Sequence, residues 1–251
     1  MRIFRVEHRG AVFYARAQGN EPLELLSGPP WSGGGPVGER VAQSEVRLLA
    51  PVTPTKIVCV GRNYAAHARE LGNTVPSEPL LFLKPPSSLL GPDGEIVRPA
   101  ASERVEHEAE IGIVVGSRLK DASIAEAEAA MFGVTCINDV TARDLQRKEV
   151  QFTRAKGFDT FCPVGPWIET DLALAELTVA GRVNGQLRQR APATQMSFSI
   201  LELLCFISTA MTLEPGDLIA TGTPEGVGPL LPGDVVEIEV SGVGVLRNTV
   251  R

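Results

Sequence analysis

The chain has 251 residues, enough for one large domain or for a large domain with a small appendage. Its formal net charge of -6, without any run of lysine and arginine, argues against a nucleic-acid surface. No segment approaches the roughly 18 uncharged apolar residues of a membrane span, and the amino terminus lacks the apolar run of a signal peptide. The sequence therefore predicts a cytoplasmic protein that binds neither nucleic acid nor membrane.

The number and spacing of cysteines and histidines limit which disulfides and metal sites this chain can form. The four cysteines lie far apart in apolar contexts without a CxxC pair, which predicts free buried thiols: Cys59, Cys136, Cys162 and Cys205. The histidines are only three in number: His8, His67 and His107. A metal site in this protein must therefore rely mainly on oxygen ligands.

The first fifty residues predict a small β unit with little chemistry. Strands are expected over residues 4–10 and 12–17, a loop over 27–39 and another strand over 46–52. The glycine-rich run at 32–38 has no Lys-Ser/Thr after it, so a surface loop is favoured over a phosphate loop. We expect a small amino-terminal β subdomain at residues 1–53, followed by a main domain at 54–251.

The main domain begins with strands and short helices in alternation. The sequence predicts a buried strand at 57–61, a short helix at 64–71 capped by Asn63, and a strand at 80–84 that ends on Lys84. Ser123 and Glu126 form a capping box for a helix that should stop near Gly133. The apolar segment 134–138 then reads as a strand that delivers Asp139 at its end.

The last quarter repeats this pattern. Ser199 and Glu202 form a second capping box, for a helix that should run to about Thr212. A strand is expected at 218–223, and segments 235–240 and 243–250 read as a hairpin. Long β content with a few helices predicts an α+β fold with a rolled or folded sheet instead of a doubly wound parallel one.

Acidic residues enter an apolar strand in the segment RVEHEAEIGIVVG, residues 104–116. Because side chains alternate along a strand, Glu108 and Glu110 share the face that continues into a buried run. Two buried carboxylates cost several kcal/mol each unless they are compensated, and a divalent cation with Asp139 as third ligand would compensate them. The alternative is an exposed strand end on which the acids pair with Arg104 or Lys120.

Six motifs in order across Gly61 to Gly228 resemble the fumarylacetoacetate hydrolase family: GRNYAAHARE, PLLFLKP, EHEAEIGIVVG, NDVTARDLQ, KGFDTFCPVGPW and TGTPEGVG. The resemblance implies a mixed β-roll fold that forms a homodimer. It also implies a Mg²⁺ or Mn²⁺ site, with Ca²⁺ as a substitute, made by Glu108, Glu110 and Asp139. The sequence departs from the family at Glu106-His107, where an aspartate and an aromatic residue are expected. Glu106 could join the acidic cluster, whereas His107 should face away from it.

By resemblance, the substrate is a small 2-oxo acid: an acylpyruvate or a dioate from ring cleavage. Chelation by its carboxylate and 2-oxo oxygens would let the metal stabilise an enolate. C–C bond hydrolysis is the first hypothesis. The alternatives are isomerisation of 2-hydroxyhepta-2,4-diene-1,7-dioate, and decarboxylation of 5-oxopent-3-ene-1,2,5-tricarboxylate or oxaloacetate. A non-catalytic, metal-stabilised β domain that binds a ligand is the non-enzyme alternative.

Catalytic residues are expected outside the metal site. His67 and Glu70 are spaced i and i+3 on the short helix, so the carboxylate could orient the imidazole as a base for water; the alternative is a solvated helix pair. Lys156 could hold a developing oxyanion or a substrate carboxylate. Metal stabilisation alone needs none of these three residues, which favours an enzyme. The remaining substrate-binding candidates are Arg62, Lys84, Gln146, Asp159 and Thr223.

Overall fold

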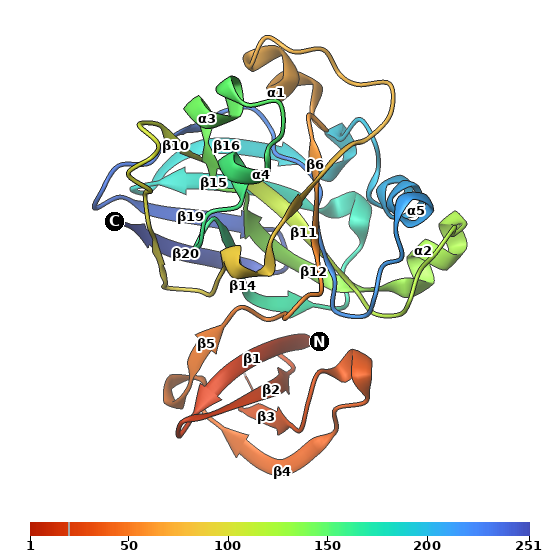
Figure 1. Cartoon of the computed structure of the whole chain (residues 1–251). Coiled ribbons are helices and arrows are strands. Elements are labelled where there is room, and N and C mark those ends of the chain that lie inside the picture. The colour runs from red at the N-terminus through yellow and green to blue at the C-terminus, as the bar shows by residue number, and fades with distance from the viewer. Residues whose placement is uncertain (20) are drawn as a thin grey trace.

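The amino-terminal lobe consists of short antiparallel strands. The computed structural model describes residues 1–19 and 21–251. The lobe contains strands β1 (Arg2–His8), β2 (Ala11–Ala17), β3 (Leu23–Leu26), β4 (Pro36–Val41) and β5 (Arg47–Leu49), with 3-10 turns η1 (Pro30–Ser32) and η2 (Gln43–Glu45). Figure 1 shows these strands gathered at one end of the molecule, apart from the helices. Strand β1 pairs with β14 through Arg2–Glu169 and Ile3–Ile168, so the lobe continues a sheet of the main domain.

The rest of the chain is a mixture of strands and short helices. Its strands are β6 (Ile57–Gly61), β7 (Leu80–Lys84), β8 (Leu89–Leu90), β9 (Glu95–Ile96), β10 (Val105–His107), β11 (Ala109–Val115), β12 (Met131–Asn138), β13 (Thr141–Ala142), β14 (Cys162–Glu169), β15 (Thr178–Val183), β16 (Gln186–Pro192), β17 (Leu218–Ala220), β18 (Gly228–Pro229), β19 (Val235–Val240) and β20 (Gly244–Val250). Its helices are α1 (Ala65–Glu70), α2 (Ile124–Ala130), α3 (Arg143–Lys148), α4 (Thr153–Lys156) and α5 (Ile200–Ala210), with 3-10 turns η3 (Pro86–Ser88), η4 (Leu174–Glu176) and η5 (Ala193–Gln195). Among the described residues, no helix is long and apolar enough to cross a bilayer.

The strands form three sheets. The largest runs in the order β4-β3-β2-β1-β14-β12-β11-β17-β6-β7, a second is β13-β10-β18, and a third is β16-β15-β19-β20-β9. Most pairs are antiparallel, but β17 lies parallel to β6. Strands β15 and β19 of the third sheet pack against β11. This arrangement confirms the expected α+β fold with a folded mixed sheet.

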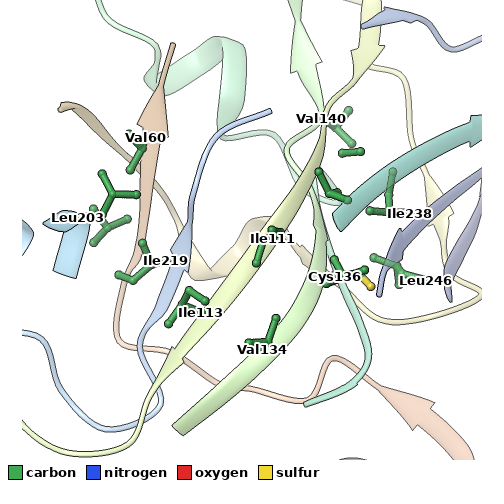
Figure 2. Close-up of a cluster of buried hydrophobic side chains, with 14 of the residues drawn as sticks. Val60, Ile111, Ile113, Val134, Cys136, Val140, Leu203, Ile219, Ile238 and Leu246 are labelled. Atoms are coloured by element: carbon green, nitrogen blue, oxygen red, sulfur yellow. The ribbon is translucent and has the colours of Figure 1, made fainter. Parts of the chain in front are cut away.

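Strand β11 lies between the two sides of the core. Its residues Ala109, Ile111 and Ile113 enter the larger apolar cluster, which includes Leu203 of α5, whereas Val114 enters a second cluster on the opposite face. Figure 2 shows Ile111 and Ile113 between the side chains of β6, β17 and α5 and those of β12, β19 and β20. The alternation predicted for this strand is therefore present, and Glu110 lies on the face away from the larger cluster.

Two local boundaries were wrong because pairing with other strands decides them. The loop expected at 27–39 ends earlier, since residues 36–39 belong to strand β4 and pair with β3 at the edge of the sheet. The α2 helix ends at Ala130, three residues earlier than expected, and Gly133 lies inside β12. A Cβ at Gly133 would lie 2.6 Å from the Glu169 carbonyl oxygen, so this glycine permits close strand pairing and does not end the helix.

The sequence predicts that Asn63 caps α1, and this prediction is wrong. The N-cap position belongs to Tyr64, whose side chain makes no capping bond. The Asn63 side chain instead donates to the carbonyl oxygens of Phe198 (3.1 Å) and Thr221 (2.8 Å) and accepts from the Phe198 N–H (2.9 Å). This buried amide therefore joins the start of α1 to the segments that precede α5 and follow β17.

Both predicted capping boxes are present, and the box of α5 gives a stability prediction. The Ser199 hydroxyl accepts from the Glu202 N–H, and the Glu202 carboxylate accepts from the Ser199 N–H at 2.7 Å. Ser199→Ala should lower the free energy of unfolding by about 1 kcal/mol, because a helix N–H loses its partner. Urea denaturation measures this change. Ser197→Ala, two residues earlier at an exposed position, is the control and should have no effect; equal loss in both variants would contradict the capping role.

Candidate metal centre and active site

Three buried carboxylates meet at one end of β11. Glu108 lies between β10 and β11, Glu110 lies on β11, and Asp139 follows β12; one oxygen from each lies within 4.8 Å of the others. The antiparallel pairing of Ala109 with Asn138 places these segments side by side, and the Asp139 N–H donates to the Glu108 carbonyl oxygen at 2.9 Å. The same-face spacing and the strand end thus produce the acidic cluster that the sequence predicts.

Cationic side chains surround two of the three carboxylates. The Lys156 ammonium donates to Glu108 Oε2 at 2.7 Å and to Asp139 Oδ2 at 2.6 Å. Lys84 donates to Asp139 Oδ1 at 2.7 Å. The guanidinium of Arg143 bridges Glu108 and Glu106, with 2.6 Å from its Nε to Glu106 Oε2. Each carboxylate oxygen has two lone pairs, so these contacts leave acceptor capacity for a further cation.

Glu110 differs from its neighbours because no cation among the described residues contacts it within 4.0 Å. Its carboxylate accepts from the backbone N–H of Gly222 at 2.8 Å. Gly222 has φ +101°, and a Cβ there would lie 2.7 Å from Asn63 Cβ, so only glycine allows this approach. Burial, together with the charges of Asp139 and Glu108, raises the pKa of Glu110 well above its usual range. The cluster therefore contains one buried carboxylate without a counter-charge.

The charges of Glu108 and Lys156 each favour the ionised form of the other group. Burial alone would raise the pKa of Glu108, but the positive charges of Lys156 and Arg143 hold it below its usual range. Burial alone would lower the pKa of Lys156, but Asp139 and Glu108 hold it above its usual range. Lys156 therefore stays protonated and can stabilise negative charge, but it is not available as a general base.

The donor set fits a hard divalent cation. All the oxygen donors are buried carboxylates, and Glu110 lacks the counter-charge that such an ion would provide. Glu108, Glu110 and Asp139 are the residues that would hold it. The alternative of an exposed acidic strand end is wrong, because Glu108 and Glu110 are only 4% and 1% exposed. Arg104 pairs with Glu106 and Lys120 with Asp121, and neither pairs with Glu108 or Glu110.

His67 and Glu70 form the expected pair on α1. His67 Nδ1 lies 3.3 Å from Glu70 Oε2, and Glu70 Oε1 also accepts from the Gly226 N–H at 3.0 Å. Because a carboxylate can only accept, Nδ1 carries a proton, so in the neutral form of the ring the lone pair lies on Nε2. His67 is 5% exposed and lines a cavity, which argues against a solvated helix pair.

A cavity of about 200 Å³ brings most of the predicted site residues together. Polar and charged residues on its wall are Arg62, His67, Asn73, Glu108, Glu110, Asp139, Arg143, Gln146, Arg147, Lys156 and Thr223. Its apolar wall consists of Val60, Leu71, Phe82 and Phe152. Figure 1 shows α1, α3 and α4, which carry several of these side chains, at the end of the molecule away from the amino-terminal lobe. The volume is below the roughly 300 Å³ of the smallest drug-sized sites, so it suits a small metabolite.

Two expected substrate contacts are not supported by this geometry. The Lys84 side chain is fully buried behind Asp139, which it contacts together with the Val140 carbonyl oxygen, and it does not line the cavity. Asp159 is exposed in the turn after α4 and also lies outside the cavity wall. Lys84 therefore acts on the ligand carboxylate of Asp139, and Asp159 has no place in the site.

Sequence reasoning also missed residues that shape the site. Arg143 was not singled out, although it follows Asp139 in the motif NDVTARDLQ, and Glu106 pairs with it instead of joining the three-carboxylate cluster. The buried amide of Gln189 links His107 Nδ1 (2.9 Å) with the Thr223 hydroxyl (2.8 Å). Thr223 in turn donates to the Ala109 carbonyl oxygen at 2.9 Å. His107 therefore faces away from the carboxylates, as expected.

Both parts of the chain match known protein families. Residues 56–251 match the family model described as fumarylacetoacetate (FAA) hydrolase C-terminal, and residues 1–51 match one described as Rv2993c-like, N-terminal. The mitochondrial oxaloacetate tautomerase FAHD2B of Bos taurus is 44% identical over 221 residues, which cover 83% of this chain and 70% of that protein. The mitochondrial oxaloacetate decarboxylase of Dictyostelium discoideum is 46% identical over 198 residues, covering 76% and 91%.

Solved structures resemble the whole chain. The crystal structure of a 5-carboxymethyl-2-hydroxymuconate delta-isomerase from Mycobacterium smegmatis superposes with a TM-score of 0.93 at 43% identity, covering 100% of this chain and 99% of that one. This agreement includes the amino-terminal lobe, since the full length of both chains takes part. The fold around the three carboxylates is thus one that other enzymes share.

Proposed function

Because the chain belongs to the fumarylacetoacetate hydrolase family, we propose that it is a Mg²⁺- or Mn²⁺-dependent enzyme that forms enolates from small 2-oxo acids. One observation carries this proposal: the buried carboxylates Glu108, Glu110 and Asp139 share a cavity with Lys156 and His67. A domain that only needed a metal for stability would not require a protonated lysine and an oriented imidazole beside it. Keto–enol tautomerisation, isomerisation and decarboxylation all belong to this chemistry.

The bound cation would supply Lewis-acid stabilisation of charge that develops on the 2-oxo oxygen. This chain's own residues do the rest. The Lys156 ammonium stabilises negative charge on the substrate, since it stays protonated between Glu108 and Asp139. His67 Nε2 accepts a proton and returns it, and Glu70 keeps the imidazole in the required tautomer. The side-chain amide N–H groups of Gln146 can donate to the substrate carboxylate, whereas the Thr223 hydroxyl already donates to the Ala109 carbonyl oxygen.

C–C bond hydrolysis is the second candidate, and the His67–Glu70 pair favours it. An imidazole whose Nδ1–H is held by a carboxylate can take a proton from water as readily as from carbon. The relatives named above carry out tautomerisation, decarboxylation and isomerisation, so these reactions are supported at least as well as hydrolysis. The two classes differ in whether water is consumed.

Turnover by metal-stripped protein with added Mg²⁺ or Mn²⁺ tests the proposal. With oxaloacetate, we expect faster loss of the enol absorbance, or release of pyruvate and CO₂, only when metal is present. With acetylpyruvate, release of acetate would identify the hydrolytic reaction. No turnover of either substrate by protein that binds metal would reject the enzyme hypothesis.

Oxalate binding provides a separate prediction that needs no turnover. Oxalate resembles the carboxylate and enolate oxygens of the substrate, so its attraction should come mostly from chelation. Calorimetry should detect binding with Mg²⁺ present and little or none after treatment with a chelator. Equal affinity under both conditions would contradict a metal-dependent substrate site.

A further inference from the structure

Two arginines on the cavity wall have no counter-charge. Among residues 1–19 and 21–251, no carboxylate lies within 4.0 Å of the guanidinium of Arg62 or Arg147, and neither side chain makes a hydrogen bond to protein. Arg143 and Lys156, on the same wall, are by contrast each paired with buried carboxylates. Arg62 and Arg147 are therefore the two cationic groups on this wall that pair with no carboxylate of the described residues.

The helix α3 directs Arg147 towards the site. Arg143, Gln146 and Arg147 are spaced i, i+3 and i+4, so they share one face of the helix, and all three line the cavity. Arg143 donates to Gln146 Oε1 at 2.5 Å, which orients this face with respect to the carboxylates. Lys148 is the next residue along the same helix, but it does not line the cavity.

Arg62 is held in place by its backbone. It has φ +60°, a left-handed conformation that residues with a side chain rarely adopt. The conformation is maintained because the next residue, Asn63, is fixed by its bonds to Phe198 and Thr221. The backbone of Arg62 therefore has a defined position at the cavity wall, from which its side chain reaches the cavity.

The charges at the inner end of the cavity are already matched. The carboxylates of Glu106, Glu108 and Asp139 pair with four cationic side chains, Lys84, Arg104, Arg143 and Lys156, so that among the described residues of this cluster Glu110 alone is left for a divalent cation. A divalent cation added there would be matched in turn by the anionic 2-oxo acid end of a substrate. A substrate with one carboxylate would leave Arg62 and Arg147 without a partner, whereas a second carboxylate would neutralise charge on both.

We propose that Arg62 and Arg147 bind a second, distal carboxylate of the substrate, so that the site selects 2-oxo dicarboxylates over acylpyruvates with a single carboxylate. This inference rests on the proposed function, because the same cation and 2-oxo acid end define the inner position. Val60, Leu71, Phe82 and Phe152 line the cavity and suit the carbon chain between the two carboxylates. A guanidinium can donate two parallel hydrogen bonds to a carboxylate, which gives both affinity and orientation.

Binding of a matched ligand pair tests the selection of substrates without any need for turnover. 2-Oxoglutarate and 2-oxopentanoate have equally long carbon chains, and only the former carries a distal carboxylate. Calorimetry on the Mg²⁺-loaded protein should show roughly 10- to 100-fold tighter binding of 2-oxoglutarate, as expected for a hydrogen-bonded charge pair. Arg147→Gln should remove most of this preference, while Lys148→Gln, with the same change of charge on the same helix, should keep it.

The outcomes separate this inference from the proposed function. Equal affinities of the two ligands for the unchanged protein, or equal loss of preference in Arg147→Gln and Lys148→Gln, would overturn the distal carboxylate site. If the preference is present but no 2-oxo acid is turned over, the enzyme hypothesis fails and the binding site stands. With turnover, Arg147→Gln should raise KM for oxaloacetate far more than it lowers kcat, and it should leave KM for acetylpyruvate nearly unchanged.

Discussion

Replacing His67 with alanine is expected to lower turnover by roughly 10²- to 10⁴-fold, the usual contribution of a general base, without changing the affinity for Mg²⁺ or oxalate. The reason is spatial: His67 lines the cavity but is not one of the three carboxylates that would hold the cation. Steady-state kinetics and calorimetry on the same preparation measure the two quantities. A full turnover rate on every 2-oxo acid tested would show that His67 takes no part in the chemistry.

Two further variants of α1 sharpen this test. Glu70→Gln should lose less activity than His67→Ala, because an amide can still contact the imidazole and the Gly226 N–H but directs the ring less well. Arg69→Ala changes an exposed residue of the same helix that does not line this cavity, and it should behave like the unchanged protein. Equal losses in all three variants would point to disruption of α1 and not to a catalytic imidazole.

Replacing Glu110 with glutamine is expected to have opposite effects on metal binding and on stability. Affinity for Mg²⁺ should fall by at least about 100-fold, since even the loss of groups that merely support a metal ligand costs 10- to 100-fold. The metal-free variant should unfold at an equal or higher temperature. Its neutral amide can keep the bond from the Gly222 N–H, and unlike a carboxyl group it cannot take the charged form that burial, Asp139 and Glu108 disfavour.

Calorimetry with Mg²⁺ and thermal unfolding in the presence of a chelator measure these two effects. Glu128→Gln is the matched control, because it makes the same change of charge at an exposed position of α2. Unchanged metal affinity in Glu110→Gln would contradict the assignment of this ligand. A lower unfolding temperature of the metal-free variant would show that protein groups alone offset the cost of burying the Glu110 carboxylate. No cation would then be needed to compensate it.

The sequence predicted those parts of the fold that depend on neighbouring residues. The capping boxes at Ser123 and Ser199, and the hairpin of β19 and β20, are set by contacts within a few positions along the chain, and the structure has all three. The parallel pairing of β17 with β6 joins segments about 160 positions apart and has no local signal. Strand β4 was missed for the same kind of reason, since its glycine- and proline-rich sequence becomes a strand only when β3 lies beside it.

The residues of the candidate site also fall into two groups: those that local sequence could predict and those whose position depends on distant segments. Glu108 and Glu110 could be placed on one face from their spacing alone, and Asp139 could be added as third ligand because it follows another apolar strand, in agreement with the family resemblance. The burial of Arg143 and Lys84 could not be predicted, because a charged residue at a helix start or a strand end is normally solvated. Each is buried here only because it meets a carboxylate from a distant segment: Glu106 and Glu108 in one case, Asp139 in the other.

The position of β17 between β11 and β6 has a consequence for how this protein is made on the ribosome. The backbone N–H that contacts Glu110 belongs to Gly222, directly after this strand, and strand β6 lacks its neighbour on one side until β17 arrives. During synthesis, Glu108 and Glu110 emerge more than a hundred residues before β17 does. The nascent chain therefore cannot form the contact between Glu110 and the Gly222 N–H until nearly all of the protein has been translated, so the three carboxylates reach their final arrangement only late in the assembly of this sheet.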